Sequence, residues 1–414
     1  MATFQMPEPS PDALAASRAL AARIVADIDA AGGSIGFDRY MHLALYEPGL
    51  GYYAGGSLKF GPGGDFVTGP ELSPLYGACL ATQCAAWLQE LPPQVIEFGA
   101  GTGALAAQLL NELARLGFGD VRYSIVEVSA ELRDRQQHTI SALAPEMVDR
   151  VSWLDAMPER IDGVVLGNEL LDAMPVRMFH LNGCLLRERG VTWRDQRFQW
   201  MDRLADARFA SDVVDGLAGA DWPRHDVLDL LHVAEAPALR KEAAEALSDL
   251  DYHAEVPEVA VAWTETLMGR LGRAAVLLVD YGFPAREFYH PQRSRGTLMC
   301  HYRHHAHDDP FYLPGLQDIT AHVDFSAIAR AAERGGAAWC GYTSQARFLL
   351  NCGLLDRLAK VPRADPAIYG RQAQAAQRLL SEAEMGELFK VIAFGVGCEP
   401  QAVGFAQGDR SHTL

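Results

Sequence analysis

The sequence predicts an α/β protein with a doubly wound sheet, an N-terminal helical cap and a large α+β insertion. Three observations support this fold class. A short apolar strand at 95–98 is followed by a glycine turn and an apolar helical run at 104–116. Strands and helices then alternate along the chain, which is typical of a parallel sheet with crossover helices. Residues 274–280 form an apolar run, as expected for a strand covered on both faces.

Residues 1–74 are expected to form helices and a long loop. An alanine-rich amphipathic helix over 12–31 ends at two glycines, and a second helix is expected over 37–46. Residues 49–69 combine many glycines with aromatic side chains, which indicates an ordered loop rather than a flexible linker. A helix over 72–90 then leads into the first core strand.

The core is predicted to consist of residues 75–177 and 259–398. Its first half alternates strands and helices, with strands at 95–98, 121–127, 151–154 and 163–167 and helices at 104–116 and 130–141. Its second half contains the strand at 274–280, a polar loop rich in histidine and arginine, a helix over 324–334, a strand at 337–341, a helical insertion at 344–384 and a last strand at 389–394. Residues 178–258 are too long for one crossover and begin as a β-meander before continuing as helices, so we expect an inserted cap. Residues 399–414 form a tail.

Composition limits the possible partners. The chain has 414 residues, of which 49% are hydrophobic and 21% are charged, as is typical of a globular protein. Its formal net charge of -17 argues against nucleic acid as a partner, because a phosphate backbone would be repelled. The scattered cysteines, the lack of a long apolar run and the lack of a targeting pattern predict a cytoplasmic protein without membrane insertion.

The most informative motif is the glycine turn, which contains Gly99, Ala100, Gly101 and Gly103. Its glycines allow the backbone to approach a nucleotide-like ligand at the N-terminus of the next helix. The same spacing fits a dinucleotide-binding pattern, so a nicotinamide or flavin site stays open at this point. Glu97 favours a different cofactor. A carboxylate there would repel a pyrophosphate, whereas it would attract the cationic methionine part of S-adenosylmethionine (SAM).

Three further loops follow predicted strands, and in open α/β sheets the carboxyl ends of the strands face the ligand. Glu127, with Val128 beside it, is placed to accept hydrogen bonds from ribose hydroxyls, although a solvated strand end is the alternative. Asp155 and Ala156 are candidates for contact with the adenine amino group, but an ordinary loop aspartate explains Asp155 equally well. Segment 168–175 brings two acids and an asparagine to the same edge, and acids also suit the first turn of a helix.

Several motifs in a fixed order resemble the MidA family of class I SAM-dependent methyltransferases. These motifs occupy residues 46–48, 51–53, 64–74, 97–103, 168–175 and 318–325. The resemblance covers about residues 35–396 and implies a Rossmann-like sheet with SAM as the cofactor. The family includes a mitochondrial complex I assembly factor that methylates protein arginine. By that analogy, the resemblance implies a protein substrate and symmetric dimethylation of an arginine in a respiratory-complex subunit.

The chemistry of an arginine acceptor can be compared with the residues. A guanidinium arrives charged because its pKa is above 12, so carboxylates must hold it beside the methyl donor. Glu169 is the first candidate for this role and Asp172 the second, whereas Asn168 is assigned to the cofactor. Thr68 and Glu71 end a glycine-rich segment that is expected to fold over the cofactor, with a structural Ω-loop as an equal alternative.

Tyr281, His322 and Asp324 are candidates for the acceptor pocket, and Asp324 is also a candidate helix N-cap. Histidines and acids at 301–309 raise the alternative of a metal site. Arginines lie among them, and class I methyl transfer needs no metal, so none is predicted. Three alternatives to an arginine methyltransferase remain: methyl transfer to a small molecule or to another protein side chain, a SAM-binding assembly factor without catalysis, and a dinucleotide oxidoreductase.

Overall fold

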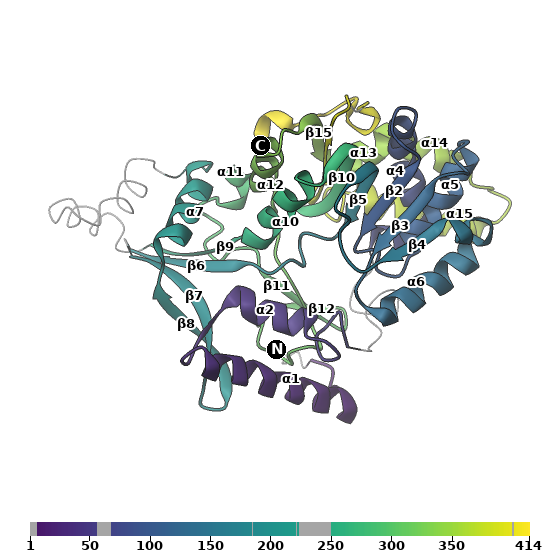
Figure 1. Cartoon of the computed structure of the whole chain (residues 1–414). Helices are drawn as coiled ribbons and strands as arrows, with labels where there is room; N and C mark the ends of the chain where they lie inside the picture. The colour runs from purple at the N-terminus through teal and green to yellow at the C-terminus, as the bar shows by residue number, and fades with distance from the viewer. Residues whose placement is uncertain (1–5, 56–67, 184, 221, 223–249, 400) are drawn as a thin grey trace.

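The computed structural model describes residues 6–55, 68–183, 185–220, 222, 250–399 and 401–414. Its centre is a large sheet with the strand order β15-β16-β10-β5-β2-β3-β4, and the short strand β14 also pairs with β10 (Figure 1). These strands are β2 (Gln94–Phe98), β3 (Arg122–Val126), β4 (Val151–Leu154), β5 (Ile161–Asn168), β10 (Leu271–Phe283), β14 (Val323–Asp324), β15 (Ala338–Ser344) and β16 (Phe389–Val396). With helices on both faces, this order confirms the predicted doubly wound α/β fold.

One strand departs from the predicted parallel arrangement. β16 pairs antiparallel with both β10 and β15, whereas β10, β5, β2, β3 and β4 pair in parallel. Three helices connect β15 to β16, namely α13 (Gln345–Asn351), α14 (Leu354–Ala359) and α15 (Pro366–Leu380). They return the chain to the carboxyl edge of β10, where Phe389 pairs with Tyr281, so β16 must run back across the sheet.

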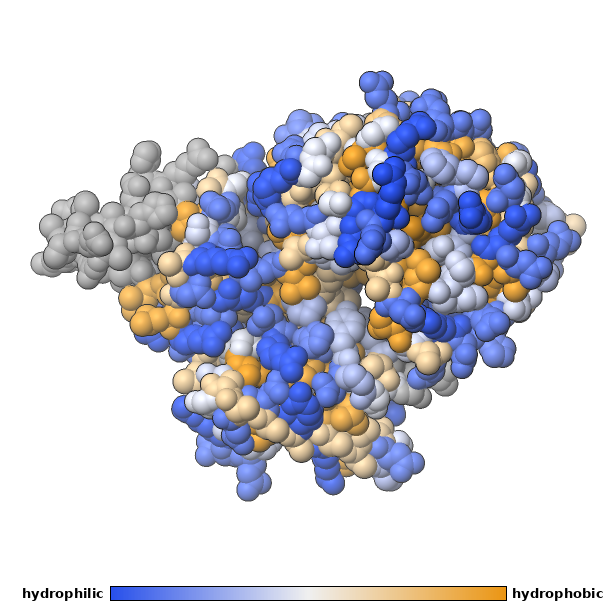
Figure 2. All heavy atoms as spheres, viewed as in Figure 1, coloured by the Kyte–Doolittle hydropathy of each residue, from blue (hydrophilic) through white to orange (hydrophobic). Residues whose placement is uncertain are grey.

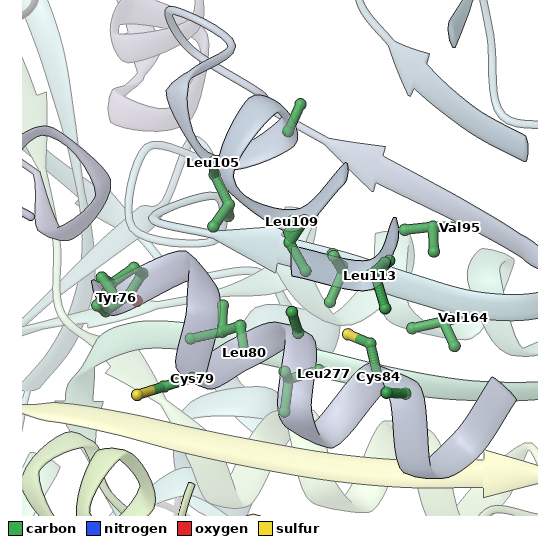
Figure 3. Packing of buried hydrophobic residues seen from close by; sticks show 14 of the residues in the cluster. Tyr76, Cys79, Leu80, Cys84, Val95, Leu105, Leu109, Leu113, Val164 and Leu277 are labelled. Atoms are coloured by element: carbon green, nitrogen blue, oxygen red, sulfur yellow. The ribbon is translucent and has the colours of Figure 1, made fainter. Parts of the chain in front are cut away.

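Helices cover both faces of the large sheet. One face packs against α4 (Pro74–Leu88), α5 (Ala104–Arg115), α6 (Ala130–Leu143) and the helices α13 to α15. Figure 3 shows Leu80 of α4 and Leu109 of α5 packing beside Val164 and Leu277 of the sheet. The other face packs against α10 (Glu258–Met268) and α12 (Phe325–Arg334). Alternate residues of each strand therefore enter two separate apolar layers, as the continuous apolar runs predict.

The N-terminal helices pack on the insertion. α1 (Pro11–Ala30) and α2 (Phe37–Tyr46) share a buried cluster with a second sheet. That sheet contains β1 (Ile35–Gly36), β6 (Arg177–Asn182), β7 (Leu185–Arg194), β8 (Arg197–Leu204) and β9 (Asp251–Val256). β1 pairs antiparallel with β7, with Ile35 opposite Val191. Segments far apart in the sequence thus form one body beside the large sheet.

Two predicted irregular or helical regions contain strands instead. Within the expected cap, α7 (Ala207–Ala218) is helical, as predicted. β9 is a strand, and alternate residues of it, Tyr252, Ala254 and Val256, enter a buried cluster. Residues 223–249 of the cap lie outside the described residues. After β10 and the short helix α11 (Ala285–Phe288), the polar segment forms a small sheet of β11 (Met299–Tyr302), β12 (His305–His307) and β13 (Asp318–Thr320). These strands are short and polar, so their sequence carries little periodic signal.

Among the described helices, none has the length and apolar character needed to cross a membrane. In the space-filling view, hydrophilic side chains are spread over the outer surface, and the molecule is hollowed between the N-terminal helices and the large sheet (Figure 2). The carboxyl edge of the large sheet faces the interior of the molecule there.

Candidate active site

A cavity of about 1100 Å³ lies at the carboxyl edge of β2, β3, β5 and β10. Its walls also include residues of the N-terminal segment, of β13 and of the loop before β16. The predicted site residues that line it are Thr68, Glu71, Glu97, Gly99, Ala100, Gly101, Glu127, Val128, Asn168, Glu169, Asp172, Tyr281 and His322. The cavity therefore brings together residues at the carboxyl ends of four parallel strands and residues from the N-terminal and C-terminal parts of the chain.

The glycine turn forms one wall of the cavity. Gly99, Gly101 and Gly103 have φ values of 69°, 51° and 83°, in the left-handed region that glycine adopts without a steric cost. Gly103 caps the N-terminus of α5 and is not among the residues that line the cavity. A Cβ atom on Gly103 would lie 3.0 Å from the Cα atom of Gln136, so its place in the motif is explained by packing against α6.

Glu97 lies at the end of β2 and is only 1% exposed. The Tyr123 hydroxyl donates a hydrogen bond of 2.8 Å to its Oε2 atom. Burial raises the pKa of Glu97 to about 7, and the hydrogen bond from Tyr123 acts in the opposite direction. A cation bound in the cavity would favour the ionised carboxylate.

Glu127 is held by a network that the sequence did not reveal. Its Oε1 atom accepts the N–H of Ser129 at 2.8 Å, and its Oε2 atom accepts Nε2 of Gln136 at 3.2 Å. The same amide nitrogen donates to the carbonyl oxygen of Gly101 at 3.1 Å. Gln136 of α6 thus connects the glycine turn to Glu127, and burial raises the pKa of that carboxyl. Fixed acceptors at this position suit a ribose.

The predicted role of Asp155 and Ala156 is not supported by their position. Both residues are exposed, and neither lines the cavity. Arg133 of α6 places its guanidinium against the carbonyl oxygens of Glu127 and Leu154 and forms an ion pair of 2.7 Å with Asp155. The Asp155 side chain is 92% exposed and lies outside the cavity, as the loop-aspartate alternative expects.

Glu169 has an unusual backbone conformation. Its φ is 50°, which a residue other than glycine rarely adopts. Its N–H donates to the carbonyl oxygen of Val279 at 2.8 Å, and its carboxylate accepts hydrogen bonds from Nδ2 of Asn168 at 3.2 Å and from the N–H of Gly69. Burial, followed by the charge of Asp172, raises the pKa of Glu169 to about 8.

Asp172 is a buried neighbour of Glu169, and the Tyr281 hydroxyl donates to its carboxylate. Its Oδ1 atom is buried and has no hydrogen-bond partner among the described residues. Burial raises the pKa of Asp172 to about 6, whereas the hydrogen bond from Tyr281 lowers it. A buried acceptor without a partner is costly, so this atom requires a donor from a ligand.

The segment that was predicted to fold over the cofactor is described only at its end. Glu71 lies on the short helix α3 (Gly69–Leu72), and its Oε1 atom accepts the Thr102 hydroxyl at 2.5 Å. Thr68 and Glu71 both line the cavity. Residues 64–67, which belong to the same motif, lie outside the described residues.

Of the three residues predicted for the acceptor pocket, Tyr281 and His322 line the cavity. The ring of His322 lies edge-on to Tyr281, with 5.2 Å between ring centroids, and burial lowers the pKa of His322 to about 4. Asp324 is not among the lining residues. It is the N-cap of α12, and its Oδ1 atom accepts the N–H of Ala327 at 3.0 Å, so the cap explains this residue.

Among the lining residues that were not predicted as site residues are Tyr46, Tyr53 and Asp318. The Tyr46 hydroxyl donates to the carbonyl oxygen of Ala173 at 2.8 Å, and the Tyr53 hydroxyl donates to Oδ1 of Asp318 at 2.9 Å. The two tyrosine rings stack with 5.5 Å between their centroids. All three belong to motifs quoted for the family resemblance, and this was the only signal that could have found them.

Carboxylates dominate the walls of the cavity. Those among the lining residues are Glu71, Glu97, Glu127, Glu131, Glu169, Asp172 and Asp318, whereas the basic side chains there are His301, His322 and Arg378. The histidine segment thus contributes His301 to the wall. Outside the cavity, His180, Asp251 and His253 of the second sheet place three potential metal-ligand atoms within 4.8 Å of one another, and the two histidine rings stack at 18°.

A doubly wound sheet with a glycine turn, buried acids and a cavity at its carboxyl edge defines a class of enzymes that bind a nucleotide-like cofactor. A family model described as "Putative S-adenosyl-L-methionine-dependent methyltransferase" matches residues 79–343. A crystal structure from Burkholderia thailandensis with bound S-adenosyl-homocysteine is 49% identical, covers 99% of this chain and 100% of that chain, and has a TM-score of 0.85. The chain belongs to this family of SAM-dependent methyltransferases and uses SAM as its cofactor.

More distant relatives carry a more specific name. The protein arginine methyltransferase NDUFAF7, mitochondrial, from Danio rerio is 27% identical over 90% of this chain and 85% of its own length. The protein of the same name from Rattus norvegicus is 29% identical over 87% of this chain and 81% of its own length. These relatives are named as mitochondrial, which contradicts the cytoplasmic location expected from the sequence and corrects that prediction.

Proposed function

We propose that this methyltransferase acts on protein arginine and that Glu169 and Asp172 bind the acceptor guanidinium. The observation that carries the proposal is the buried Oδ1 atom of Asp172, which lines the cavity without a hydrogen-bond partner among the described residues. A guanidinium presents several N–H donors in a planar fork, so it can satisfy this atom and the Glu169 carboxylate together. The names of the distant relatives support the same acceptor.

The residues also fit the cofactor. We propose that Glu97 faces the cationic methionine part, Glu127 the ribose, and the backbone of Gly99, Ala100 and Gly101 the space between them. When bound, SAM supplies an electrophilic methyl group on a sulfonium. The chain must align the acceptor nitrogen with that methyl group and take up the proton that this nitrogen loses. Glu169 can accept that proton only as a carboxylate; burial raises its pKa to about 8, and a bound guanidinium favours the ionised form that the step requires.

By analogy with the MidA family, we further propose an arginine of a respiratory-complex subunit as the target and symmetric dimethylation as the product. The test incubates the protein with SAM carrying a tritiated methyl group and with total protein from cells that lack this chain. After acid hydrolysis, we expect the label in methylarginines, with symmetric dimethylarginine separated by chromatography.

Glu169→Gln tests the assigned residue. We expect it to lower the labelling by about 100-fold, because loss of an electrostatic contact made in the transition state has this order of effect. SAM affinity should stay within about threefold, since the cofactor-facing acids are unchanged. Glu146→Gln, at an exposed glutamate, is the matched control. Label in another amino acid or in a small molecule, or full activity of Glu169→Gln, would contradict the proposal.

A further inference from the structure

Asp280 is a fully buried carboxylate behind the loop that carries Glu169 and Asp172. Its Oδ2 atom accepts three backbone N–H groups, from Leu170 at 3.0 Å, Leu171 at 2.8 Å and Asp172 at 3.4 Å. Its Oδ1 atom accepts the N–H of Tyr281 at 3.1 Å. One side chain of β10 therefore accepts hydrogen bonds from consecutive backbone N–H groups of the loop that follows β5.

These amides need such an acceptor. The loop has left the ladder between β5 and β10, which pair in parallel up to Asn168 and Val279. Buried N–H groups outside a ladder must find another partner, because an unpaired one costs free energy. The loop also begins with the left-handed φ of Glu169, a conformation that persists only where the surrounding structure holds it.

We infer that Asp280 is a positioning residue for methyl transfer, which fixes the 169–172 loop so that the Glu169 and Asp172 carboxylates face the acceptor. The inference rests on the proposed function, because it gives Glu169 and Asp172 the acceptor-binding role. Asp280 itself does not line the cavity, so it acts through the loop and not by contact with substrate. The carboxyl group of Asp280 also completes a set of hydrogen bonds that no apolar side chain could replace.

Asp280→Asn and Asp280→Ala test this role. Asparagine keeps one acceptor oxygen, but its NH2 group would face the N–H of Tyr281 or the N–H groups of the loop, so that two donors meet. Alanine removes both acceptor atoms. We expect Asp280→Asn to lower the rate of tritium transfer to total cell protein by about 100-fold, since displacement of catalytic groups by about 1 Å has this order of effect. Asp280→Ala should lose more. SAM affinity, measured by calorimetry, should change less than about threefold.

Asp162→Asn is the matched control. Asp162 lies on β5 and accepts the N–H of Arg273 on β10 at 2.8 Å, so it links the same two strands at the opposite edge of the sheet. Its transfer rate should stay within about twofold of wild type. Hydrogen exchange followed by mass spectrometry should show slow exchange of the amides at 170–172 in wild type and in Asp162→Asn, and faster exchange in both Asp280 variants.

Fast exchange at 170–172 in the wild-type protein would overturn the inference, even if no Asp280 variant folds. Folded Asp280→Asn with an unchanged transfer rate or unchanged protection would overturn it as well. Loss of SAM affinity in parallel with the transfer rate would point to a general structural role and against a positioning role. The proposed function fails separately if Glu169→Gln keeps full transfer, because hydrogen exchange and SAM affinity need no acceptor.

Discussion

The pH dependence of SAM binding should report on Glu97. Burial places the pKa of Glu97 near 7, so the carboxylate is about 9% ionised at pH 6 and about 91% ionised at pH 8. If the ionised form binds the cationic part of SAM, the affinity contributed by Glu97 rises about tenfold between these pH values. The bound cation lowers the pKa of Glu97. Binding at pH 7 should therefore release about half a proton.

Isothermal calorimetry at pH 6, 7 and 8, in buffers of different ionisation enthalpy, measures both the affinity and the protons released. Glu97→Gln is the comparison, because glutamine keeps the size of the side chain and does not titrate. The α-amino group of SAM titrates near pH 8 in both proteins, so the difference between them isolates Glu97. An identical pH dependence in wild type and Glu97→Gln would refute the assignment of Glu97 to the cation.

Two further predictions concern the turn and the core. Gly103→Ala should destabilise the protein by about 1–2 kcal/mol, because alanine is disfavoured at φ 83° and its Cβ atom would press on the backbone of Gln136. The variant should also bind SAM more weakly. A melting temperature equal to that of wild type, both with and without S-adenosyl-homocysteine, would contradict these two expectations. Leu109→Ala removes a fully buried side chain between α4 and α5 and should cost about 3–5 kcal/mol in urea unfolding, whereas a loss under about 1 kcal/mol would show that this layer is loosely packed.

The sequence could indicate which residues of the proposed cofactor site line the cavity, because they lie at strand ends. Glu97 and Asn168 lie in the last residues of β2 and β5, and Glu127 directly follows β3; parallel strands bring their carboxyl ends to one edge. An apolar run and the residue after it are local features, so they can be recognised without the fold. Asp155 lies outside the cavity, and its ion pair with Arg133 of α6 is a contact between separate elements that the sequence does not reveal.

The part of the cavity that we propose to bind the acceptor is formed by contacts between segments far apart in the sequence. Tyr46 and Tyr53 reach the cavity because the N-terminal helices dock on the inserted sheet through the pairing of β1 with β7. Neither the 35–36 strand nor its partner carries a pattern that specifies this pairing. In the sequence, Asp280 is only the end of an apolar strand. Its three hydrogen bonds to the 170–172 loop could not be predicted without knowing that β5 and β10 are neighbours.

The two buried carboxyl groups of the proposed acceptor site, Glu169 and Asp172, favour a cationic substrate. Burial raises the pKa of Glu169 to about 8 and that of Asp172 to about 6, and repulsion by the charge of Asp172 adds to the shift of Glu169. A neutral acceptor would leave that repulsion in place and would offer Asp172 Oδ1 fewer donors, whereas a guanidinium would favour the ionised form of both carboxylates. Acceptor binding should therefore release protons from the site. Under the proposed function, the two carboxylates would recognise the charge of the acceptor before they take part in transfer to it.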